Sequence, residues 1–220
     1  MFSKFVFEYL LGYADCIGLF MPLLVFVLLG KKIQMPGKQA VVIYYCIFFV
    51  LTMLASYLSY NDLYNNWVYD TIPFFLSIPI YFFFWQIPNS IIGKKLNLLC
   101  LLLFLFYYGF TWKTAIDIPL NTEYYLYFAM YILICSAGYL MQELKLMREG
   151  FVFARIEFWM VASLLFYACV CTLMWSFFSY LINYGPEDFL HFAYIWSLCH
   201  NLTLFIACSV FSWVLYRKFR

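Results

Sequence analysis

Long apolar runs separated by short polar loops dominate this sequence of 220 residues. A helix needs about 20 residues, within a range of roughly 17–25, to cross the ~30 Å hydrocarbon core of a bilayer. The runs that meet this requirement cover residues 9–29, 40–60, 63–87, 96–112, 124–141, 158–182 and 189–216. The pattern therefore predicts an all-α, polytopic membrane protein, with residues 1–220 forming one domain, a bundle of seven transmembrane helices.

The composition of the chain also indicates a lipid environment. Hydrophobic residues make up 67% of the sequence and charged residues only 11%, whereas a soluble domain is about half apolar and about a quarter charged. Aromatic residues reach 25%, which a codon preference for Phe and Tyr explains, although some Tyr and Trp should anchor helices at the interface. No basic patch is interleaved with aromatic residues, so we expect the lipid bilayer as a partner and no nucleic acid.

The charged residues predict how the bundle crosses the membrane. Positive residues gather beside the first, third and fifth loops and at the C-terminus, and only Lys4 and Lys113 fall on the other side. The positive-inside rule therefore places the N-terminus outside and the C-terminus in the cytoplasm, and we expect the protein in the cytoplasmic (inner) membrane. The first run ends at Lys31 and Lys32 without a cleavage site, so we expect it to be retained as a span.

The spacing of cysteine and histidine gives no sign of a metal or cofactor. None of the eight cysteines forms a C-x-x-C pair, and all lie inside apolar runs, as small buried hydrophobes do. His191 and His200 are nine positions apart in the last run, so they point to opposite helix faces and cannot hold a metal together. We therefore predict no cofactor and no metal, and we assign no catalytic residue.

Residues 61–88 are the most unusual part of the pattern. They open with a polar, aromatic cluster and carry Asp70 about 10 Å into a span, at roughly 1.5 Å per residue. Pro73 and Pro79 follow inside the apolar run. Each lacks an N–H and frees the carbonyl four residues earlier, which lipid tolerates only where neighbouring helices supply a new donor. We therefore predict an interior, kinked helix in which Pro73 and Pro79 permit a conformational change.

Ionisable residues within the spans are the candidates for function. Asp70 is costly in lipid unless it serves a function, although an Asp two turns from the interface can also reach back to the headgroups. His191 lies near the outer end of the last span, and His200 lies near the bilayer midplane. A histidine at that depth is either a structural group bonded to a neighbouring helix or a ligand contact that responds to protons. Both interpretations stay open for each residue.

We expect an outward-facing pocket for a small ligand, cation or proton, in a sensor or receptor-like protein that signals through a partner. The expected ligand-binding residues are Tyr13, Asp15, Asn66, Trp67, Asp70, Thr71, His191, His200 and Asn201. The loops are too short to hold an effector domain, so the signal would pass to another protein.

Other functions stay open. A membrane-embedded enzyme acting on a lipid or isoprenoid could use Asp70, His200 and either Ser163 or Ser176, although the sequence has no nucleophile-elbow motif. A small-solute transporter of the PQ-loop type would need Pro-Gln corners, and the sequence has no Pro-Gln dipeptide. A structural membrane subunit would need no pocket. A retinal protein would need a lysine in the middle of the last span, where the sequence has none.

Three short motifs resemble a family of small bacterial seven-helix membrane proteins. Residues 65–73, N-N-W-V-Y-D-T-I-P, are similar to the third-span signature of that family, roughly N-x-W-L-Y-H/N-I-x-x-P-x-E, and residues 157–167 and 196–201 resemble its sixth and seventh spans. The family is similar to proteins encoded beside sensor histidine kinases, so the resemblance implies a sensory or accessory role with a membrane histidine kinase as partner. Phe75 stands where the family often has Glu, which implies an altered site or one that uses Asp70 instead.

Overall fold

The computed structural model is all-helical in the part of the chain that it describes, residues 13–87, 91–112, 122–145, 152–184 and 189–220. Within these ranges it describes the side chains except those at 91–92, 152, 178–184, 189–194 and 196. The described residues form seven α-helices and one 3-10 turn, and they include no strand. The bounds are α2 Ala14–Leu29, α3 Lys38–Tyr60, α4 Asn66–Gln86, α5 Ile91–Thr111, α6 Thr122–Lys145, η2 Val152–Ala154, α7 Ile156–Tyr184 and α8 Phe189–Phe219.

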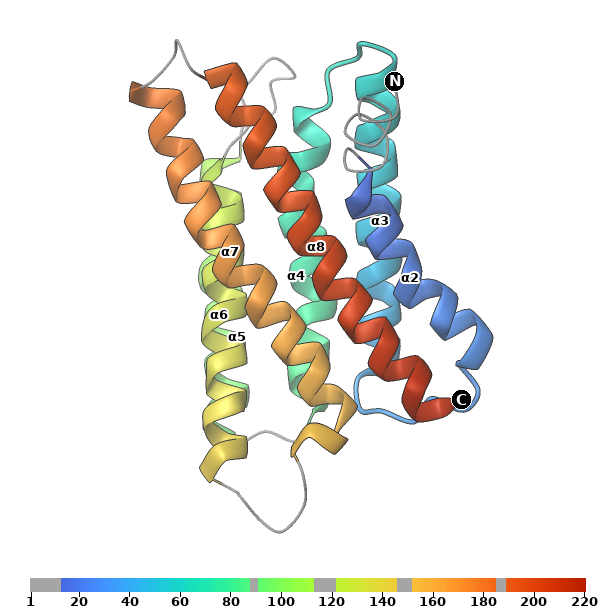
Figure 1. Ribbon diagram of the computed structural model, residues 1–220. Helices are drawn as coiled ribbons and strands as arrows, with labels where there is room; N and C mark the ends of the chain where they lie inside the picture. The colour runs from blue at the N-terminus through green and yellow to red at the C-terminus, as the bar shows by residue number, and fades with distance from the viewer. Residues whose placement is uncertain (1–12, 88–90, 113–121, 146–151, 185–188) are drawn as a thin grey trace.

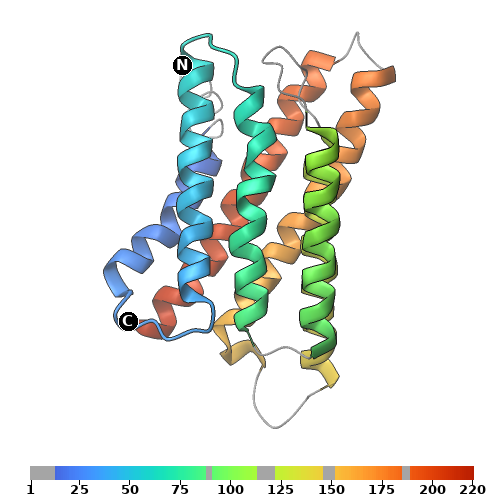
Figure 2. The ribbon, with the colours of Figure 1, turned by 180° about the vertical axis from the view of Figure 1, so that it is seen from behind.

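The helices form a ring in which each packs against its neighbour in sequence and α8 closes the ring against α2 (Figures 1 and 2). Successive helices run in opposite directions, so α2 and α8 are parallel neighbours. α4 packs against α6 as well as against α3 and α5. Of the candidate spans, α4 has the largest buried share, 56%. The prediction that this proline-containing helix lies in the interior is therefore confirmed.

Six of the described helices are long and apolar enough to cross a membrane, which makes the chain a multi-pass membrane protein. α2 is apolar but has only 16 residues; the first expected span began earlier, and residues 9–12 lie outside the described ranges. α4 begins at Asn66 and not at the expected residue 63, because the chain first makes a turn in which Asp62 takes a left-handed conformation, with φ 54°. α6 and α8 continue past the apolar runs, because their polar last turns extend into the interface.

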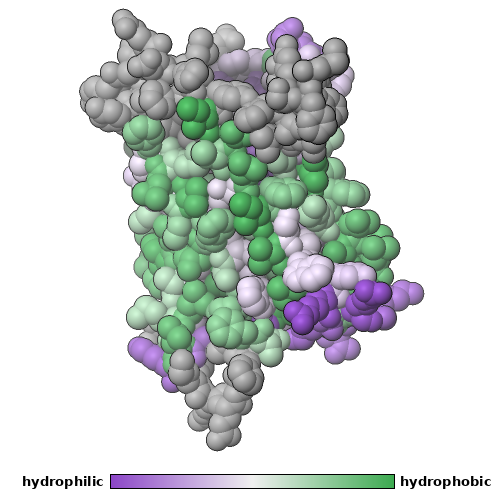
Figure 3. All heavy atoms as spheres, in the orientation of Figure 1, coloured by the Kyte–Doolittle hydropathy of each residue, from purple (hydrophilic) through white to green (hydrophobic). Residues whose placement is uncertain are grey.

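Basic residues are gathered at one end of the bundle. Figure 3 shows apolar side chains across the middle of the face in view and hydrophilic ones at its lower edge. All Lys and Arg residues in the described ranges lie at the end where α2, α4, α6 and α8 finish and where α3, α5 and α7 start. We call this the basic end. The positive residues that the sequence places in alternate loops are thus gathered at one end of the folded bundle.

Tyrosines from neighbouring helices donate hydrogen bonds to backbone carbonyls of α4 near Pro73. Pro73 offers no N–H to the carbonyl of Tyr69, and the Tyr125 hydroxyl of α6 donates to that oxygen at 2.8 Å. The Tyr108 hydroxyl of α5 donates to the next carbonyl, that of Asp70, at 3.2 Å. α4 runs unbroken through both of its prolines. The prediction that a neighbouring helix satisfies a freed carbonyl is confirmed at Tyr69.

Two further polar contacts tie α6 to its neighbours. Asn97 of α5 is 1% exposed; it donates to the Tyr81 carbonyl of α4 at 3.1 Å and accepts from the Tyr131 hydroxyl of α6 at 2.8 Å. At the basic end, Arg155 donates to both carboxylate oxygens of Glu143, at 3.0 and 2.8 Å. Hydrogen bonds between membrane helices are worth roughly 1 kcal/mol each. Such ties add modest stability and fix which helices are neighbours.

A close approach of two backbones sets α2 against α8. A Cβ at Gly18 would lie 2.8 Å from the Cα of Phe205, so only glycine fits at this crossing. About one turn before these residues lie Asp15 on α2 and Asn201 on α8. The crossing therefore brings polar residues of the two parallel helices together inside the bundle.

We expect Tyr125→Phe to lower the free energy of unfolding by about 1–3 kcal/mol, because it removes the donor that serves the Tyr69 carbonyl. The same substitution should cost clearly less in a Pro73→Ala background, where a new backbone N–H at position 73 can serve that carbonyl. A double-mutant cycle on the purified protein, read by denaturant unfolding, measures the coupling.

Tyr127→Phe is the matched control, because Tyr127 lies on the same helix and is 46% exposed. It should change the free energy of unfolding little. If Tyr125→Phe lowers the free energy of unfolding equally with Pro73 and in the Pro73→Ala background, the Tyr125 hydroxyl does not replace the missing backbone donor.

Candidate ligand-binding site

A cavity of about 160 Å³ lies between the helices, in the half of the bundle away from the basic end. Six of the seven described helices line it, and α5 does not. We call it the central cavity. Its lining residues are Asp15 of α2, Phe48 and Thr52 of α3, Tyr69 and Ile72 of α4, Tyr125 of α6, Trp175 of α7, and Ser197, His200 and Asn201 of α8. Aromatic walls with a few convergent polar groups are typical of small-molecule sites.

Asp15 brings a carboxylate to the cavity from the first turn of α2. A helix N-terminus favours a negative charge, and the backbone N–H of Cys16 donates to Asp15 Oδ1 at 2.7 Å. Asp15 also interacts electrostatically with His200 of α8. Two ionisable side chains from opposite ends of the sequence therefore share one site.

Both ring nitrogens of His200 lie near hydrogen-bonding groups. Nε2 is 2.9 Å from the Tyr167 hydroxyl of α7, and Nδ1 is 3.5 Å from Oδ1 of Asn201, a weaker contact. The rings of Tyr167 and Trp175 stand edge-on to the imidazole, with centroids 5.7 and 6.5 Å away. His200 is therefore bonded to a neighbouring helix and at the same time forms part of the cavity wall. The two interpretations that the sequence left open are compatible.

Thr52 carries a buried hydroxyl with no hydrogen-bond partner in the described part of the protein. The residue is 3% exposed and lines the central cavity. A buried hydroxyl without a partner costs roughly 1–3 kcal/mol. A polar group of a molecule inside the cavity would remove that cost.

Four aromatic side chains form much of the remaining wall: Phe48, Tyr69, Tyr125 and Trp175. Tyr125 and Trp175 stack with their centroids 4.2 Å apart and an interplanar angle of 16°. The faces of such rings are apolar but carry a negative quadrupole potential. The wall therefore suits apolar groups, and a ring face turned to the cavity would also suit positive charge.

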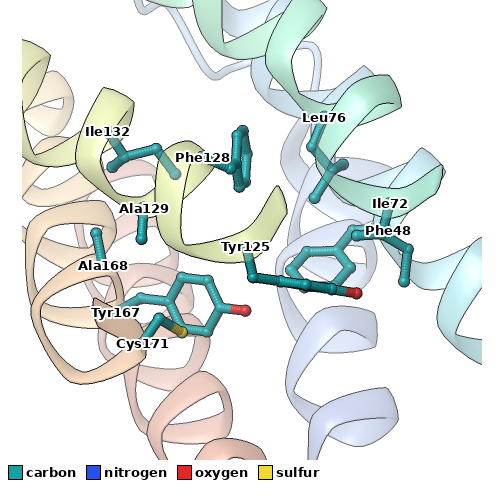
Figure 4. A pocket seen from close by; sticks show the side chains of 10 residues that line it. All are labelled: Phe48, Ile72, Leu76, Tyr125, Phe128, Ala129, Ile132, Tyr167, Ala168 and Cys171. Carbon is teal, nitrogen blue, oxygen red and sulfur yellow. The ribbon is translucent and has the colours of Figure 1, made fainter. Parts of the chain in front are cut away.

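A second void of only about 10 Å³ adjoins the central cavity (Figure 4). Phe48, Ile72 and Tyr125 line both. Figure 4 shows Tyr125 reaching from α6 toward α4, with the hydroxyl of Tyr167 directed toward its ring. The void has room for about one water molecule. The core next to the central cavity is therefore closely packed.

Three of the residues expected from the sequence meet at the central cavity: Asp15, His200 and Asn201. Tyr13, just before α2, is 39% exposed and is not among the lining residues. His191 belongs to α8, but its side chain lies outside the described ones.

The polar start of α4 does not line the cavity. Trp67 is 44% exposed, as suits an anchor at the membrane interface. Asn66 donates to the Tyr64 hydroxyl at 3.1 Å, and Thr71 donates to a carbonyl of its own helix at 2.8 Å. The side chains of Asn66 and Thr71 therefore form hydrogen bonds with residues close in sequence, near the start of α4.

Asp70 lies toward α5 and α6 and not among the residues of the central cavity. It interacts electrostatically with Tyr108 and Tyr125. The preceding residue, Tyr69, is the one that lines the cavity. Because successive helix residues differ by about 100° in direction, the neighbour of a lining residue points elsewhere. Asp70 and His200 therefore do not share one cavity.

The serines named for the enzyme hypothesis lie away from the central cavity. Ser176 donates to the Thr172 carbonyl of its own helix at 2.8 Å. Ser163 lines a void of about 10 Å³ and a pocket of about 240 Å³ between α7 and α8, and neither shares a lining residue with the central cavity. His200 and Asp70 therefore have neither serine beside them in the central cavity. Among the described residues, no three His, Cys, Asp or Glu side chains are placed to hold a metal ion.

Sequence reasoning missed seven of the ten lining residues, and also Tyr167, which contacts His200. The missed lining residues are Phe48, Thr52, Tyr69, Ile72, Tyr125, Trp175 and Ser197. The interpretation of the many tyrosines as a codon preference gave no reason to expect them as hydrogen-bond donors. One signal was present: a proline inside a span frees a carbonyl, and a tyrosine on another span is a suitable donor. Which tyrosine serves which carbonyl follows only from the packing.

No protein-family model matches this chain, and no curated protein or solved structure matches it either. The functional argument therefore depends on the fold and on the central cavity.

We expect Thr52→Val to raise the thermal unfolding midpoint of the ligand-free protein, by a gain of roughly 1 kcal/mol, because a methyl group replaces an unpaired buried hydroxyl. Thr203→Val is the matched control, since Thr203 is 8% exposed and its hydroxyl donates to the Cys199 carbonyl at 2.8 Å. It should give no gain. Thermal unfolding in one detergent compares the two. A clear loss of stability in Thr52→Val would mean that the hydroxyl is already bonded, for instance to water.

Proposed function

We propose that this chain is a receptor-like integral membrane protein that binds a small ligand in the central cavity and signals through a partner. The observation that carries the proposal is a cavity of about 160 Å³ within the bundle, lined by Asp15, Thr52 and His200 together with aromatic rings. A volume of that order accommodates a molecule about the size of benzene.

The polar groups of the cavity support binding in preference to a purely structural role. Charged and polar side chains inside a bilayer are costly and are commonly retained for function. Here a carboxylate, an imidazole, an amide and hydroxyls converge from α2, α3 and α8. Close packing of apolar side chains would stabilise the same volume without that cost.

Tyr125 connects the cavity to the backbone of α4. Its ring lines the cavity, and its hydroxyl donates to the Tyr69 carbonyl that Pro73 leaves free. A ligand that shifts this ring would weaken that hydrogen bond at the point where α4 lacks one of its own. Pro73 and Pro79 would then let α4 change conformation. Ligand binding would in this way shift the equilibrium between two conformations of α4.

We infer that the signal leaves through the basic end, which the positive-inside rule assigns to the cytoplasm. The N-terminus is then outside, the C-terminus is inside, and the cavity lies in the outer half of the membrane. The connection between α6 and α7 on the inner side, residues 146–155, is too short for a catalytic domain, and we propose that the output passes to a partner. The resemblance of residues 65–73 to small bacterial seven-helix proteins favours a membrane histidine kinase for that role.

We expect at least one of three benzene-sized probes, benzyl alcohol, benzoate or benzylamine, to raise the thermal unfolding midpoint of the purified wild-type protein. Binding to the folded state alone raises stability by mass action. Ser197→Phe should abolish the shift, because Ser197 lines the cavity and a phenyl ring there would fill it.

Cys199→Phe is the control, since Cys199 is exposed on the same helix and its substitution adds an equal ring outside the cavity. It should keep the full shift. The proposed ligand site is wrong if none of the three probes shifts the wild type, or if Ser197→Phe responds as the wild type does.

We expect a reporter fused after Arg220 to lie in the cytoplasm. A C-terminal green fluorescent protein should therefore fluoresce in bacterial cells, while a C-terminal alkaline phosphatase, which is active only outside the cytoplasm, should be inactive. The opposite pattern would reverse the orientation and place the cavity in the inner half of the membrane.

A further inference from the structure

We propose that the ligand of the central cavity is a small organic cation, an ammonium group carrying methyl substituents, with an oxygen atom a few bonds away. This inference rests on the proposed function and adds the chemical class of the ligand. Three features carry it: the carboxyl group of Asp15, the aromatic wall, and the unpartnered hydroxyl of Thr52.

Asp15 has no Lys or Arg beside it among the described lining residues, and His200 is the basic group with which it interacts. The contacts of His200 with Tyr167 and Asn201 fit a neutral tautomer, in which Nε2 accepts from the Tyr167 hydroxyl and Nδ1–H donates to Asn201 Oδ1. The hydrogen bond at Asp15 Oδ1 comes from the adjacent backbone N–H of Cys16. An ionised carboxylate at this depth is costly without an opposite charge, and a ligand cation would supply that charge.

The aromatic wall selects an organic cation over a metal ion. A methylated ammonium spreads its charge over carbon-bound hydrogens, which contact ring faces favourably, and it needs no ring of oxygen ligands. Phe48, Tyr69, Tyr125 and Trp175 line the cavity, although Tyr125 and Trp175 each use one ring face to stack on the other. A sodium or calcium ion would have to draw its oxygen ligands from Asp15, Thr52, Ser197 and Asn201, and the ring faces would offer it none.

Thr52 indicates a second polar group on the ligand. Its hydroxyl lines the cavity, is 3% exposed and has no hydrogen-bond partner in the described residues. Asp15 and Thr52 belong to different helices, α2 and α3, so the ligand would extend between them. A cation with a hydroxyl or ether oxygen near its ammonium group, of a size close to benzene, meets both requirements.

The test compares choline with 3,3-dimethylbutan-1-ol, which has the same shape and hydroxyl but a carbon atom in place of the charged nitrogen. Both are titrated into the purified full-length protein in detergent, by calorimetry and by thermal unfolding, at constant ionic strength set with sodium chloride. We expect choline to bind at least about tenfold more tightly than the neutral alcohol.

Two variants with matched controls locate the site. Asp15→Asn should weaken choline binding at least about tenfold and leave the neutral alcohol unaffected, whereas Asp62→Asn, in an exposed turn, should change neither. Trp175→Leu should weaken choline binding by about tenfold, and Trp175→Phe, which keeps an aromatic face, should lose less. If Trp175→Leu does not fold, Phe48→Leu tests the same wall.

Three results would overturn the inference: no binding of choline, equal affinity for the neutral alcohol, or unchanged choline binding by Asp15→Asn. A stabilisation that sodium ions reproduce at equal concentration would also overturn it, in favour of a metal ion. If benzyl alcohol or benzoate protects the wild type while choline does not, the ligand site stands and only the cation is wrong. If no probe binds, the ligand site falls as well.

Discussion

A bilayer interior supplies no water to a polar group, and the arrangement of this bundle depends on how α4 meets that constraint at Pro73. Pro73 leaves the Tyr69 carbonyl without its helical donor, and the Tyr125 hydroxyl takes that place at 2.8 Å. This bond requires α6 to lie beside α4, across the ring of helices, as the contacts between them show. It also directs the Tyr125 ring into the wall of the central cavity. One hydrogen bond thus links backbone integrity, helix packing and the candidate site.

The side of the cavity formed by α2 and α8 depends on the close approach of these two helices at Gly18. Only the absence of a Cβ there lets α2 approach the α8 backbone at Phe205. That approach carries Asp15 to His200 and Asn201, although the helices belong to opposite ends of the chain. Two independent contacts, one at a proline and one at a glycine, therefore set the positions of α4 and α6 and of α2 and α8, which are four of the six helices that line the cavity.

The helices themselves could be predicted from the sequence, because length and hydropathy determine whether a segment can cross a bilayer. The interior place of α4 also followed, since freed carbonyls need protein donors. The site was only partly predictable. Asp15, His200 and Asn201 stood out as polar residues at membrane depth, and they do line the cavity. Asp70 stood out for the same reason but lies toward α5 and α6, because depth in the membrane does not specify the direction in which a side chain points.

The sequence by itself determined the all-helical, multi-pass class, the approximate bounds of the spans and the separation of charge between the two ends, because each follows from local composition and from the physics of the bilayer. Only the tertiary structure decided which polar residues meet. Tyr125, Thr52 and Trp175 look like ordinary residues of apolar runs, and they become part of a site through the neighbours that packing gives them. The physical reason is that a cavity is defined by distances between helices, and no local pattern along one helix encodes those distances.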